Sequence, residues 1–333
     1  MTQKSVSATA IAWANIALIK YWGKRNEPLN LPAVGSISLT LNALKTKTHV
    51  KFDPGLTEDI FILNKNRAPE YQEKRISNFL NIIRKQSGTT LFAEIKSDNN
   101  FPTGAGLASS ASGFAALCTA ASFASGLRLS KEALSALSRM GSGSAARSIY
   151  GGIVEMQIGD DASGKNDFAV QLASREYWDL RLLVLITSQK EKKISSTDAM
   201  NISAKSSPYY DSWIKFSGMD LDEMRQAIKT KDFEKLGELT EFNALKMHAL
   251  TLSSRPPTFY WNGHTVDLIK QIRELRQKGI QVYFTIDAGP QVKVITVGDQ
   301  VKTLYKHFAS FQGVEKIIES KLGPDAELIG ETN

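Results

Sequence analysis

Residues 101–113 read FPTGAGLASSASG, in which glycines precede a run of small side chains that includes Ser109, Ser110 and Ser112. A strand, a glycine-containing loop and a helix beginning near Ser109 would aim backbone N–H groups and the positive end of the helix dipole at one point, as a phosphate requires. The GK[ST] ending of a Walker A loop is absent, and Ser109 stands where GxGxxG needs its third glycine. Small side chains would equally allow two helices to pack closely. The pattern leaves both phosphate binding and close packing open.

A second glycine and serine segment, GSGSAARS at residues 141–148, contains an arginine. The hydroxyls of Ser142 and Ser144 can donate hydrogen bonds, and Arg147 carries a planar fork that matches a carboxylate or a phosphate. A flexible turn between two helices, with its arginine on the surface, would have the same composition. Both interpretations stay open on these residues alone.

Two other patterns place charged side chains beside glycine. In ALIKYWGKR, a helical turn would align the ammonium groups of Lys20 and Lys24, although lysine stems lying along packed aromatic rings would give the same pattern. In TIDAGP, Asp287 ends a strand before Ala-Gly-Pro, where it could form a turn or serve as a rigidly held catalytic carboxylate. Together, these loops, lysines and the aspartate fit a phosphoryl-transfer site, which works by positioning and charge neutralisation.

Hydrophobic periodicity predicts the elements that would position these residues. Alternating residues in SISLTL and THVKF predict half-buried strands, and a helix running from Glu73 to Gly88 puts Arg75 near its first turn. A small-residue helix follows Ser110, and another begins after the N-cap candidate Ser130. Further strands are expected at 60–64, 91–100, 151–159, 180–188, 281–287 and 291–298, and further helices at 207–229, 231–252, 264–278 and 299–310. This mixture predicts an α+β protein rather than an alternating βα array.

Composition limits the class of protein. A chain of 333 residues that is 42% hydrophobic can bury one large core or two joined cores. Neither an apolar run of about 18 residues nor a signal-peptide layout is present, so we expect a soluble, cytoplasmic protein with no membrane partner. The single Cys118 reads as a core residue, and the spacing of the four histidines argues against a histidine metal site. The net charge of +7 favours anionic ligands but is spread too evenly for nucleic acid.

The ordered set of motifs resembles the mevalonate diphosphate decarboxylase family of the galactokinase, homoserine kinase, mevalonate kinase and phosphomevalonate kinase (GHMP kinase) superfamily. The matching segments are ANIALIKYWGKR, LNLP with SISLTL, NNFPTGAGLASSASGFAAL, GSGSAARSIYGG, SST before a methionine, and TIDAGP. The resemblance implies the GHMP-kinase fold: a ribosomal-S5-like ATP-binding lobe (1–178), a ferredoxin-like lobe (179–333), and the active site in the cleft between them. It also implies a homodimer that uses ATP and Mg²⁺ to convert mevalonate 5-diphosphate, through a 3-phosphorylated intermediate, into isopentenyl diphosphate, CO2, ADP and phosphate.

The same resemblance assigns roles to individual residues. The catalytic group would comprise Asp287 at the tertiary 3-hydroxyl, Lys20 close to it, Arg147 on the departing carboxylate, and Ser110 facing the γ-phosphate of ATP. A lysine near Asp287 would lower its pKa and favour orientation over strong proton abstraction. ATP would be held by Pro102, Gly104, Ala105, Gly106, Leu107, Ala108, Ser109 and Ser110. The substrate would be contacted by Tyr21, Trp22, Gly23, Lys24, Arg75, Ser142, Gly143, Ser144, Ala145, Ala146, Arg147, Ser196 and Thr197.

Three departures from the family pattern bear on the substrate. Gly104 replaces a common alanine, and Ala146 replaces a common cysteine. Asp198 and Ala199 stand where a glycine usually precedes the methionine, which puts a negative side chain near the expected diphosphate contact. The alternatives are therefore a mevalonate 5-phosphate decarboxylase, a GHMP-type kinase of the 3-hydroxyl, and a non-catalytic binding protein. The presence of both Asp287 and Arg147 argues against a kinase. The intact set of reactive and diphosphate-contacting residues argues against the other two.

Overall fold

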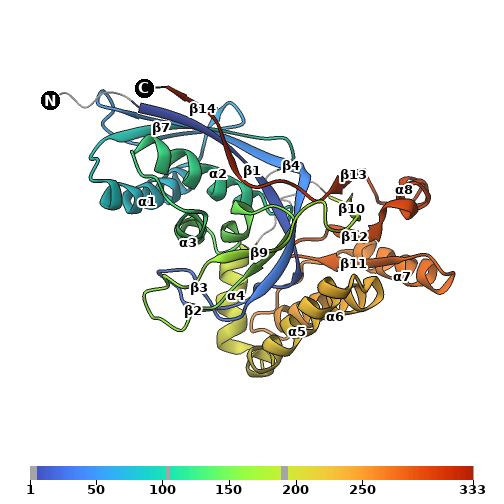
Figure 1. Cartoon of the computed structure of the whole chain (residues 1–333). Coiled ribbons are helices and arrows are strands. Elements are labelled where there is room, and N and C mark those ends of the chain that lie inside the picture. Colours follow the sequence, from blue (N-terminus) through green and yellow to red (C-terminus); the bar gives the residue numbers. More distant parts are fainter. Residues whose placement is uncertain (1–5, 103–105, 189–193, 333) are drawn as a thin grey trace.

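The computed structural model describes residues 6–102, 106–188 and 194–332. An eight-stranded sheet has the strand order β14-β1-β4-β7-β5-β6, with β8 paired to β4 and β9 paired to β8 (Figure 1). Its strands are β1 (Val6–Ile19), β4 (Ser36–Asp53), β5 (Ile60–Leu63), β6 (Asn66–Arg67), β7 (Phe92–Asn99), β8 (Ile153–Met156), β9 (Ala169–Ala173) and β14 (Glu327–Thr332). A short hairpin of β2 (Lys24–Asn26) and β3 (Leu31–Pro32) stands apart from this sheet.

The burial pattern of β4 changes along the strand. From Leu44 to Phe52 buried residues alternate with more exposed ones, as expected for a strand with one face on a core. From Ser36 to Leu41 every residue is buried, so the prediction of a half-buried strand at SISLTL is wrong. This stretch is covered on both faces because a second layer of the protein packs against it.

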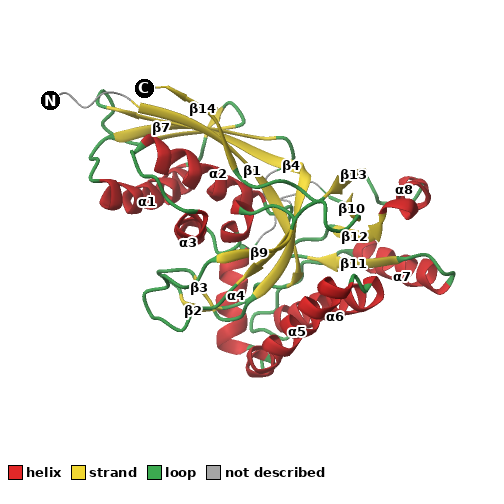
Figure 2. Cartoon of the chain, viewed as in Figure 1, coloured by secondary structure: helices red, strands yellow, loops and turns green. Residues whose placement is uncertain are grey.

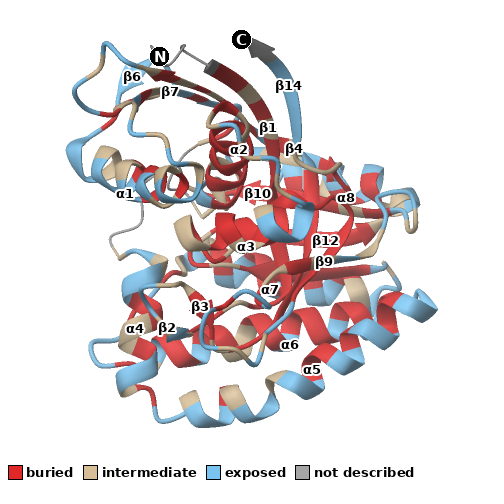
Figure 3. Cartoon of the chain, turned by 60° about the vertical axis from the view of Figure 1, so that its left-hand side comes forward, coloured by how far each residue is buried: buried red, intermediate tan, exposed pale blue. Residues whose placement is uncertain are grey.

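Three helices cover one face of the larger sheet, α1 (Glu70–Ser87), α2 (Ser109–Ala124) and α3 (Lys131–Gly141) (Figure 2). α2 is buried along most of its length (Figure 3). Several of its alanines belong to the same hydrophobic cluster as Cys118. The helix expected at 73–88 begins earlier, at Glu70, so Arg75 lies in its second turn. Close packing of small side chains is therefore one use of the segment that begins at Ser109.

The second sheet has the strand order β11-β12-β10-β13. Its strands are β10 (Leu180–Ile186), β11 (Val282–Ile286), β12 (Val292–Val297) and β13 (Lys316–Lys321). The helices of this half are α4 (Ser196–Ser206), α5 (Tyr210–Thr230), α6 (Phe233–Leu252), α7 (Gly263–Gln277) and α8 (Val301–Ala309). The helices expected at 207–229, 231–252, 264–278 and 299–310 are confirmed as α5 to α8, whereas α4 was not predicted. No helix in the described part of the chain is long and apolar enough to cross a membrane.

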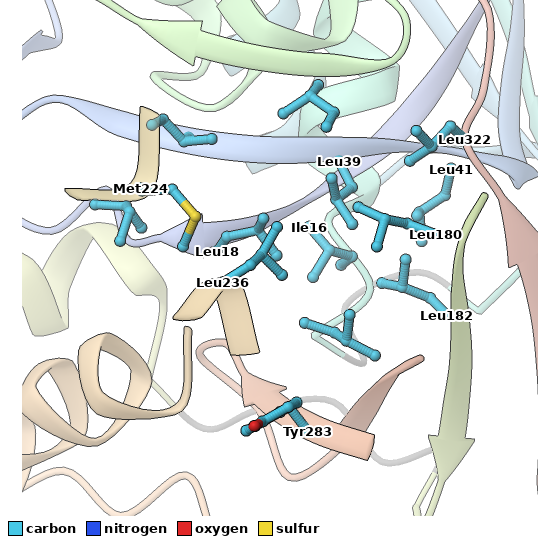
Figure 4. Close-up of a cluster of buried hydrophobic side chains, with 14 of the residues drawn as sticks. Ile16, Leu18, Leu39, Leu41, Leu180, Leu182, Met224, Leu236, Tyr283 and Leu322 are labelled. Carbon is cyan, nitrogen blue, oxygen red and sulfur yellow. The ribbon is translucent and has the colours of Figure 1, made fainter. Parts of the chain in front are cut away.

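The two sheets share one hydrophobic core (Figure 4). Ile16 of β1 and Leu39 of β4 belong to the same buried cluster as Leu182 of β10 and Tyr283 of β11. The other face of β10 packs on α7 and α8, so this strand is covered on both sides, as its continuous apolar sequence predicts. The shared core holds the end of β1 close to the end of β11.

The observed helices and sheets form the α+β arrangement that the sequence predicts. The chain returns at its end to the first sheet, where β14 pairs antiparallel with β1 and Ser7 faces Thr332. The division at residue 178 places Glu327–Thr332 in the second lobe, whereas the structure pairs this strand with the larger sheet.

Candidate active site

Asp287 follows β11 directly and lies between two lysines. Its Oδ1 accepts a hydrogen bond from Lys20 Nζ at 2.6 Å, and its Oδ2 lies 3.2 Å from Lys293 Nζ in β12. Burial alone would raise the pKa of Asp287, but the two ammonium groups outweigh that effect and hold the pKa well below its usual range. The carboxylate is therefore ionised and engaged with side chains, which favours the catalytic interpretation of Asp287 over that of a turn former.

Lys20 stands at the end of β1 with its side chain almost fully buried. Its Nζ also donates to the backbone oxygen of Ala17 at 2.8 Å, and its backbone N–H donates to Asn243 Oδ1 on α6 at 2.7 Å. Burial lowers the pKa of Lys20 to about 8, although Asp287 opposes this shift. The interpretation of Lys20 as a surface lysine, with its stem along packed aromatic rings and its ammonium in water, is therefore wrong.

The helical turn that would align Lys20 with Lys24 does not form. Lys20 follows β1, Lys24 opens β2, and Gly23 between them has φ +101°, a left-handed conformation that glycine adopts at no steric cost. A Cβ on Gly23 would lie 2.1 Å from the hydroxyl of Tyr210. Lys24 is partly buried, and burial lowers its pKa. The two ammonium groups are thus placed by a strand end and a hairpin rather than by a helix.

Arg147 is buried on the short 3₁₀ helix Ala145–Ile149. Its Nε donates to Ser38 Oγ at 3.0 Å and Asn15 Oδ1 at 3.3 Å, and one terminal nitrogen donates to Ser36 Oγ at 2.5 Å. Over residues 6–102, 106–188 and 194–332, no carboxylate lies within ion-pair distance of this guanidinium. Burial lowers its pKa to about 10. Arg147 is therefore not a surface arginine, and a buried cation held by neutral oxygens is an arrangement that favours binding of an anion.

Ser142, Gly143 and Ser144 form the turn that follows α3. Ser142 Oγ lies 3.3 Å from Ser110 Oγ in the first turn of α2 and 3.2 Å from Ser144 Oγ, which produces a row of three hydroxyls. A Cβ on Gly143 would lie 2.4 Å from the Tyr21 hydroxyl, so only glycine leaves room for that ring. Among the residues that the structure describes, the buried Tyr21 hydroxyl has no hydrogen-bond partner, and burial raises its pKa. An incoming oxygen-rich ligand could satisfy that hydroxyl.

The loop before α2 has the backbone of an anion site. Gly104 and Ala105 lie outside the described residues. Gly106 has φ +77° and Ala108, the N-cap of α2, has φ +57°. Ala108 offers no side-chain acceptor, and the first turn carries no acidic residue, so the positive end of the helix dipole is not neutralised there. Ser110 is exposed at this end. These features favour phosphate binding for the first half of the segment, beside the close packing found along α2.

The remaining predicted contacts are placed less centrally. Arg75 donates to the Gly141 oxygen at 2.9 Å, which brings it next to the 142–144 turn. The Trp22 side chain is buried in a separate cluster, and its backbone oxygen accepts from Trp213 Nε1 at 2.9 Å. Ala145 and Ala146 are buried behind Arg147, and Pro102 and Leu107 flank the phosphate loop. These residues can shape the site, although their side chains face it less directly.

Ser196 and Thr197 lie in the first turn of α4, and the buried Ala199 and Met200 of this helix belong to the same hydrophobic cluster as Ala288. Ser195 caps this helix by accepting from the Asp198 backbone N–H, and its hydroxyl donates to Asp198 Oδ2 at 2.6 Å. The Asp198 carboxylate, which the sequence placed near the diphosphate contact, is therefore engaged in helix capping. Its charge still raises the pKa of Lys24, although burial and Glu27 affect that group more.

Comparisons with known proteins agree over both halves of the chain. Residues 12–169 match the family model of the diphosphomevalonate decarboxylase-like N-terminal domain, and residues 182–328 match that of the mevalonate 5-diphosphate decarboxylase C-terminal domain. The chain is 35% identical to the diphosphomevalonate decarboxylase of Candida albicans over 98% of this chain and 99% of that protein. The chain belongs to the diphosphomevalonate decarboxylase family.

Solved structures of diphosphomevalonate decarboxylases extend the likeness to three dimensions. The enzyme from Staphylococcus aureus is 40% identical, with a TM-score of 0.93 over 98% of this chain and 99% of that one. The mevalonate diphosphate decarboxylase from Enterococcus faecalis is 42% identical, with a TM-score of 0.91 over the same shares. A further structure, 43% identical with a TM-score of 0.92 over the same shares, holds MVAPP, AMPPCP and magnesium. The fold is therefore the GHMP-kinase fold that the resemblance implies.

Several side chains that support this diphosphomevalonate decarboxylase site were not predicted. They are Lys293 beside Asp287, Asn243 at the backbone of Lys20, and the three polar residues that hold Arg147, which are Asn15, Ser36 and Ser38. Two of them could have been noticed in the sequence: Asn15 is a single amide within an apolar strand, and Lys293 is a single cation between two strand valines. The sequence does not indicate which residue either side chain contacts, because each contact is with a residue distant in the chain.

Proposed function

We propose that the protein catalyses the ATP-dependent decarboxylation of mevalonate 5-diphosphate to isopentenyl diphosphate, CO2, ADP and phosphate. The observation that carries this proposal is the ionised carboxylate of Asp287 between the buried Lys20 and Lys293. The buried guanidinium of Arg147 adds a further positive charge that could bind an anionic group of the substrate. The related structure with bound MVAPP, AMPPCP and magnesium supports the same pair of substrates.

In the first chemical step the tertiary 3-hydroxyl attacks the γ-phosphorus of ATP and the bond to the β-phosphate oxygen breaks, which releases ADP. Asp287 accepts a hydrogen bond from that hydroxyl and orients its lone pair, and the hydroxyl proton passes to the carboxylate or to solvent. Because its pKa lies below the usual range, Asp287 acts mainly by orientation and charge rather than as a strong base.

In the second step the C3–O bond breaks and phosphate leaves with the electron pair. The bond between the substrate carboxylate and C2 then breaks, and its electrons form the double bond of the product as CO2 departs. Arg147 would bind that carboxylate with its planar fork and fix its orientation. The anionic Asp287 would face the positive charge that develops at C3.

The row of hydroxyls at Ser110, Ser142 and Ser144 lies between the two ligands in this proposal. Ser110 would face the γ-phosphate from the first turn of α2, and the turn at 142–144 would bind the substrate diphosphate together with Tyr21 and Lys24. The 3.3 Å contact between Ser110 and Ser142 supports this arrangement because it links the nucleotide loop to the substrate turn.

Mg²⁺ would be held mainly by phosphate oxygens of ATP. Across the described residues, no group of three histidine, cysteine or acidic side chains is placed to hold a metal. Mg²⁺ usually keeps several waters and binds substrate phosphates together with only one or two protein oxygens, so the residues present are compatible with it. When bound, the ion would neutralise charge on the phosphates.

The domain division near residue 178, a homodimeric assembly and a cytoplasmic location belong to the same proposal and rest on the family resemblance. Sedimentation of the purified protein would measure the assembly, with twice the chain mass expected.

The deciding experiment measures ADP and CO2 release with mevalonate 5-diphosphate, mevalonate 5-phosphate and free mevalonate side by side. Equal amounts of ADP and CO2 from the diphosphate, in excess over the other two compounds, are expected. Release of ADP without CO2 would replace the decarboxylase with a kinase of the 3-hydroxyl. A preference for the monophosphate would overturn the proposed substrate.

A further inference from the structure

Lys293 is a fully buried lysine in the middle of the second sheet. Its Nζ donates to the backbone oxygen of Gly106 at 3.0 Å and forms an ion pair with Asp287 Oδ2 at 3.2 Å. Desolvating an ammonium group is costly, so a buried lysine needs close partners that compensate. Lys293 has one partner in the catalytic turn and one in the loop that precedes α2.

Neutralising Asp287 does not require Lys293. Lys20 already provides a cation at 2.6 Å from the other carboxylate oxygen. Lys293 and Arg147 both lower the pKa of Lys20, so these three cations and the one carboxylate share a neighbourhood with a net charge of +2 (three minus one). The nearby His248 adds no charge, because burial lowers its pKa to about 3. Such an excess suits a site that receives a substrate carboxylate and a phosphoryl group.

The loop and the catalytic turn also touch through their backbones. A Cβ on Gly106 would lie 3.0 Å from the Cα of Gly289, two residues after Asp287. The Lys293 ammonium lies at the same junction, since Gly106 supplies its carbonyl partner. The orientation of the Asp287 carboxylate and the path of the phosphate loop are thus tied to one side chain.

We propose that Lys293 is a positioning residue that fixes the Asp287 carboxylate through Oδ2 and links it to the phosphate loop through the Gly106 carbonyl. This inference rests on the proposed function and goes beyond it in one respect. Nucleotide binding and carboxylate orientation become coupled, so that ATP seated on the loop finds the acceptor hydroxyl already aligned.

The test compares Lys293→Met, Lys293→Gln and, as a control, Lys270→Met on the exposed side of α7. Methionine keeps most of the volume but removes both the charge and the donor. Glutamine removes the charge and retains a donor that can reach the Gly106 oxygen. Thermal unfolding first establishes that each variant is folded. If Lys293→Met does not fold, Lys293→Gln carries the test.

Two of the three measurements follow the catalysed reaction: kcat, and the pH dependence of kcat/KM. Lys293→Met is expected to lower kcat at least about 10-fold with little change in the KM for mevalonate 5-diphosphate, because alignment and not substrate binding is lost. Both Lys293 variants are expected to move the alkaline limb of kcat/KM to higher pH, since the Lys293 charge lowers the pKa of Lys20. A side chain that only supported the fold would leave that limb in place. A wild-type kcat together with an unmoved limb would overturn the inference.

A third measurement needs no turnover and separates this inference from the proposed function. Calorimetric titration with AMPPCP and Mg²⁺ should give a several-fold weaker affinity for Lys293→Met and a near wild-type affinity for Lys293→Gln and Lys270→Met. Equal affinities in all of these proteins would overturn the link to the phosphate loop. Absence of CO2 release by the wild-type protein would overturn the proposed function alone, and the titration would still decide on the link.

Discussion

The ammonium of Lys20 lies 2.6 Å from the carboxylate of Asp287, although 267 residues separate the two in the chain. Lys20 directly follows the long strand β1 of the larger sheet, and Asp287 follows β11 of the smaller one. The hydrophobic core shared by the two sheets holds these strand ends together, so the ion pair between Lys20 and Asp287 depends on packing between the two sheets.

Replacing Asp287 with asparagine should reduce kcat by about 10³-fold, because the amide keeps the shape but loses the charge that orients the hydroxyl and faces the developing cation. Affinity for AMPPCP should stay close to that of the wild type, since the contact between Lys293 and the Gly106 oxygen, which the proposal ties to nucleotide binding, does not involve the substituted side chain. Single-turnover assays and calorimetric titration measure the two quantities. A variant that lost nucleotide binding and nothing else would contradict the role of Asp287.

The pH dependence should reflect Lys20. Its pKa is lowered to about 8 from 10.5 in the folded protein, so kcat/KM should fall above about pH 8 as the ammonium beside Asp287 loses its proton. In the window between these two values the unfolded chain binds more protons, and titration of this group therefore favours the folded state as the pH rises. Activity and this stability contribution should move in opposite directions. A kcat/KM that stays flat through this window would contradict the prediction.

Arg147→Met should lower kcat/KM by about 10²-fold or more, because the substrate carboxylate would lose the buried guanidinium that the proposal assigns to it. Arg147→Lys keeps the positive charge but lacks the planar guanidinium, so its kcat/KM should lie between those of Arg147→Met and the wild type. The thermal shift caused by mevalonate 5-diphosphate should shrink in the same order. Substrate affinity equal to that of the wild type in Arg147→Met would show that the carboxylate binds elsewhere.

Gly143→Ala should weaken binding of mevalonate 5-diphosphate, because the new Cβ would lie 2.4 Å from the Tyr21 hydroxyl and the ring must move. Gly218→Ala is the matched control: its Cβ meets nothing within 4 Å on the exposed surface of α5. That control should gain about 0.5–1 kcal/mol in the free energy of unfolding and keep its KM, because alanine favours the helix. Equal KM values for the two variants would argue against a role for the Tyr21 and Gly143 contact.

The sequence predicts the elements of the site better than their partners. The strand and turn at Asp287 could be predicted because Gly and Pro mark the turn after an apolar run. The glycines and small residues of the segment before α2 left phosphate binding and close packing open, and the structure confirms close packing along α2. The sequence left a helical turn at Lys20 and Lys24 open because an apolar run with few turn signals does not distinguish a strand end from a helix. Only the left-handed backbone at Gly23 decides between them.

The polar residues that hold the charges could not be predicted because they are distant in sequence. Arg147 depends on Ser36 and Ser38, which are 111 and 109 residues away, and Lys293 depends on Gly106, which is 187 residues away. A lysine or serine inside a strand ordinarily indicates a solvent-facing position. Here both kinds of residue are buried because a second layer covers the strand.

The pairing of β14 with β1 has a consequence for folding. Until residues 327–332 are in place, one side of β1 presents unpaired backbone N–H and C=O groups, and such an open edge can template association with other chains. The same strand leads directly to Lys20. The larger sheet therefore gains a protected edge only when residues 327–332 pair, and a fragment limited to residues 1–178 would leave the Ser7–Ile11 segment of β1 as an open strand edge prone to association.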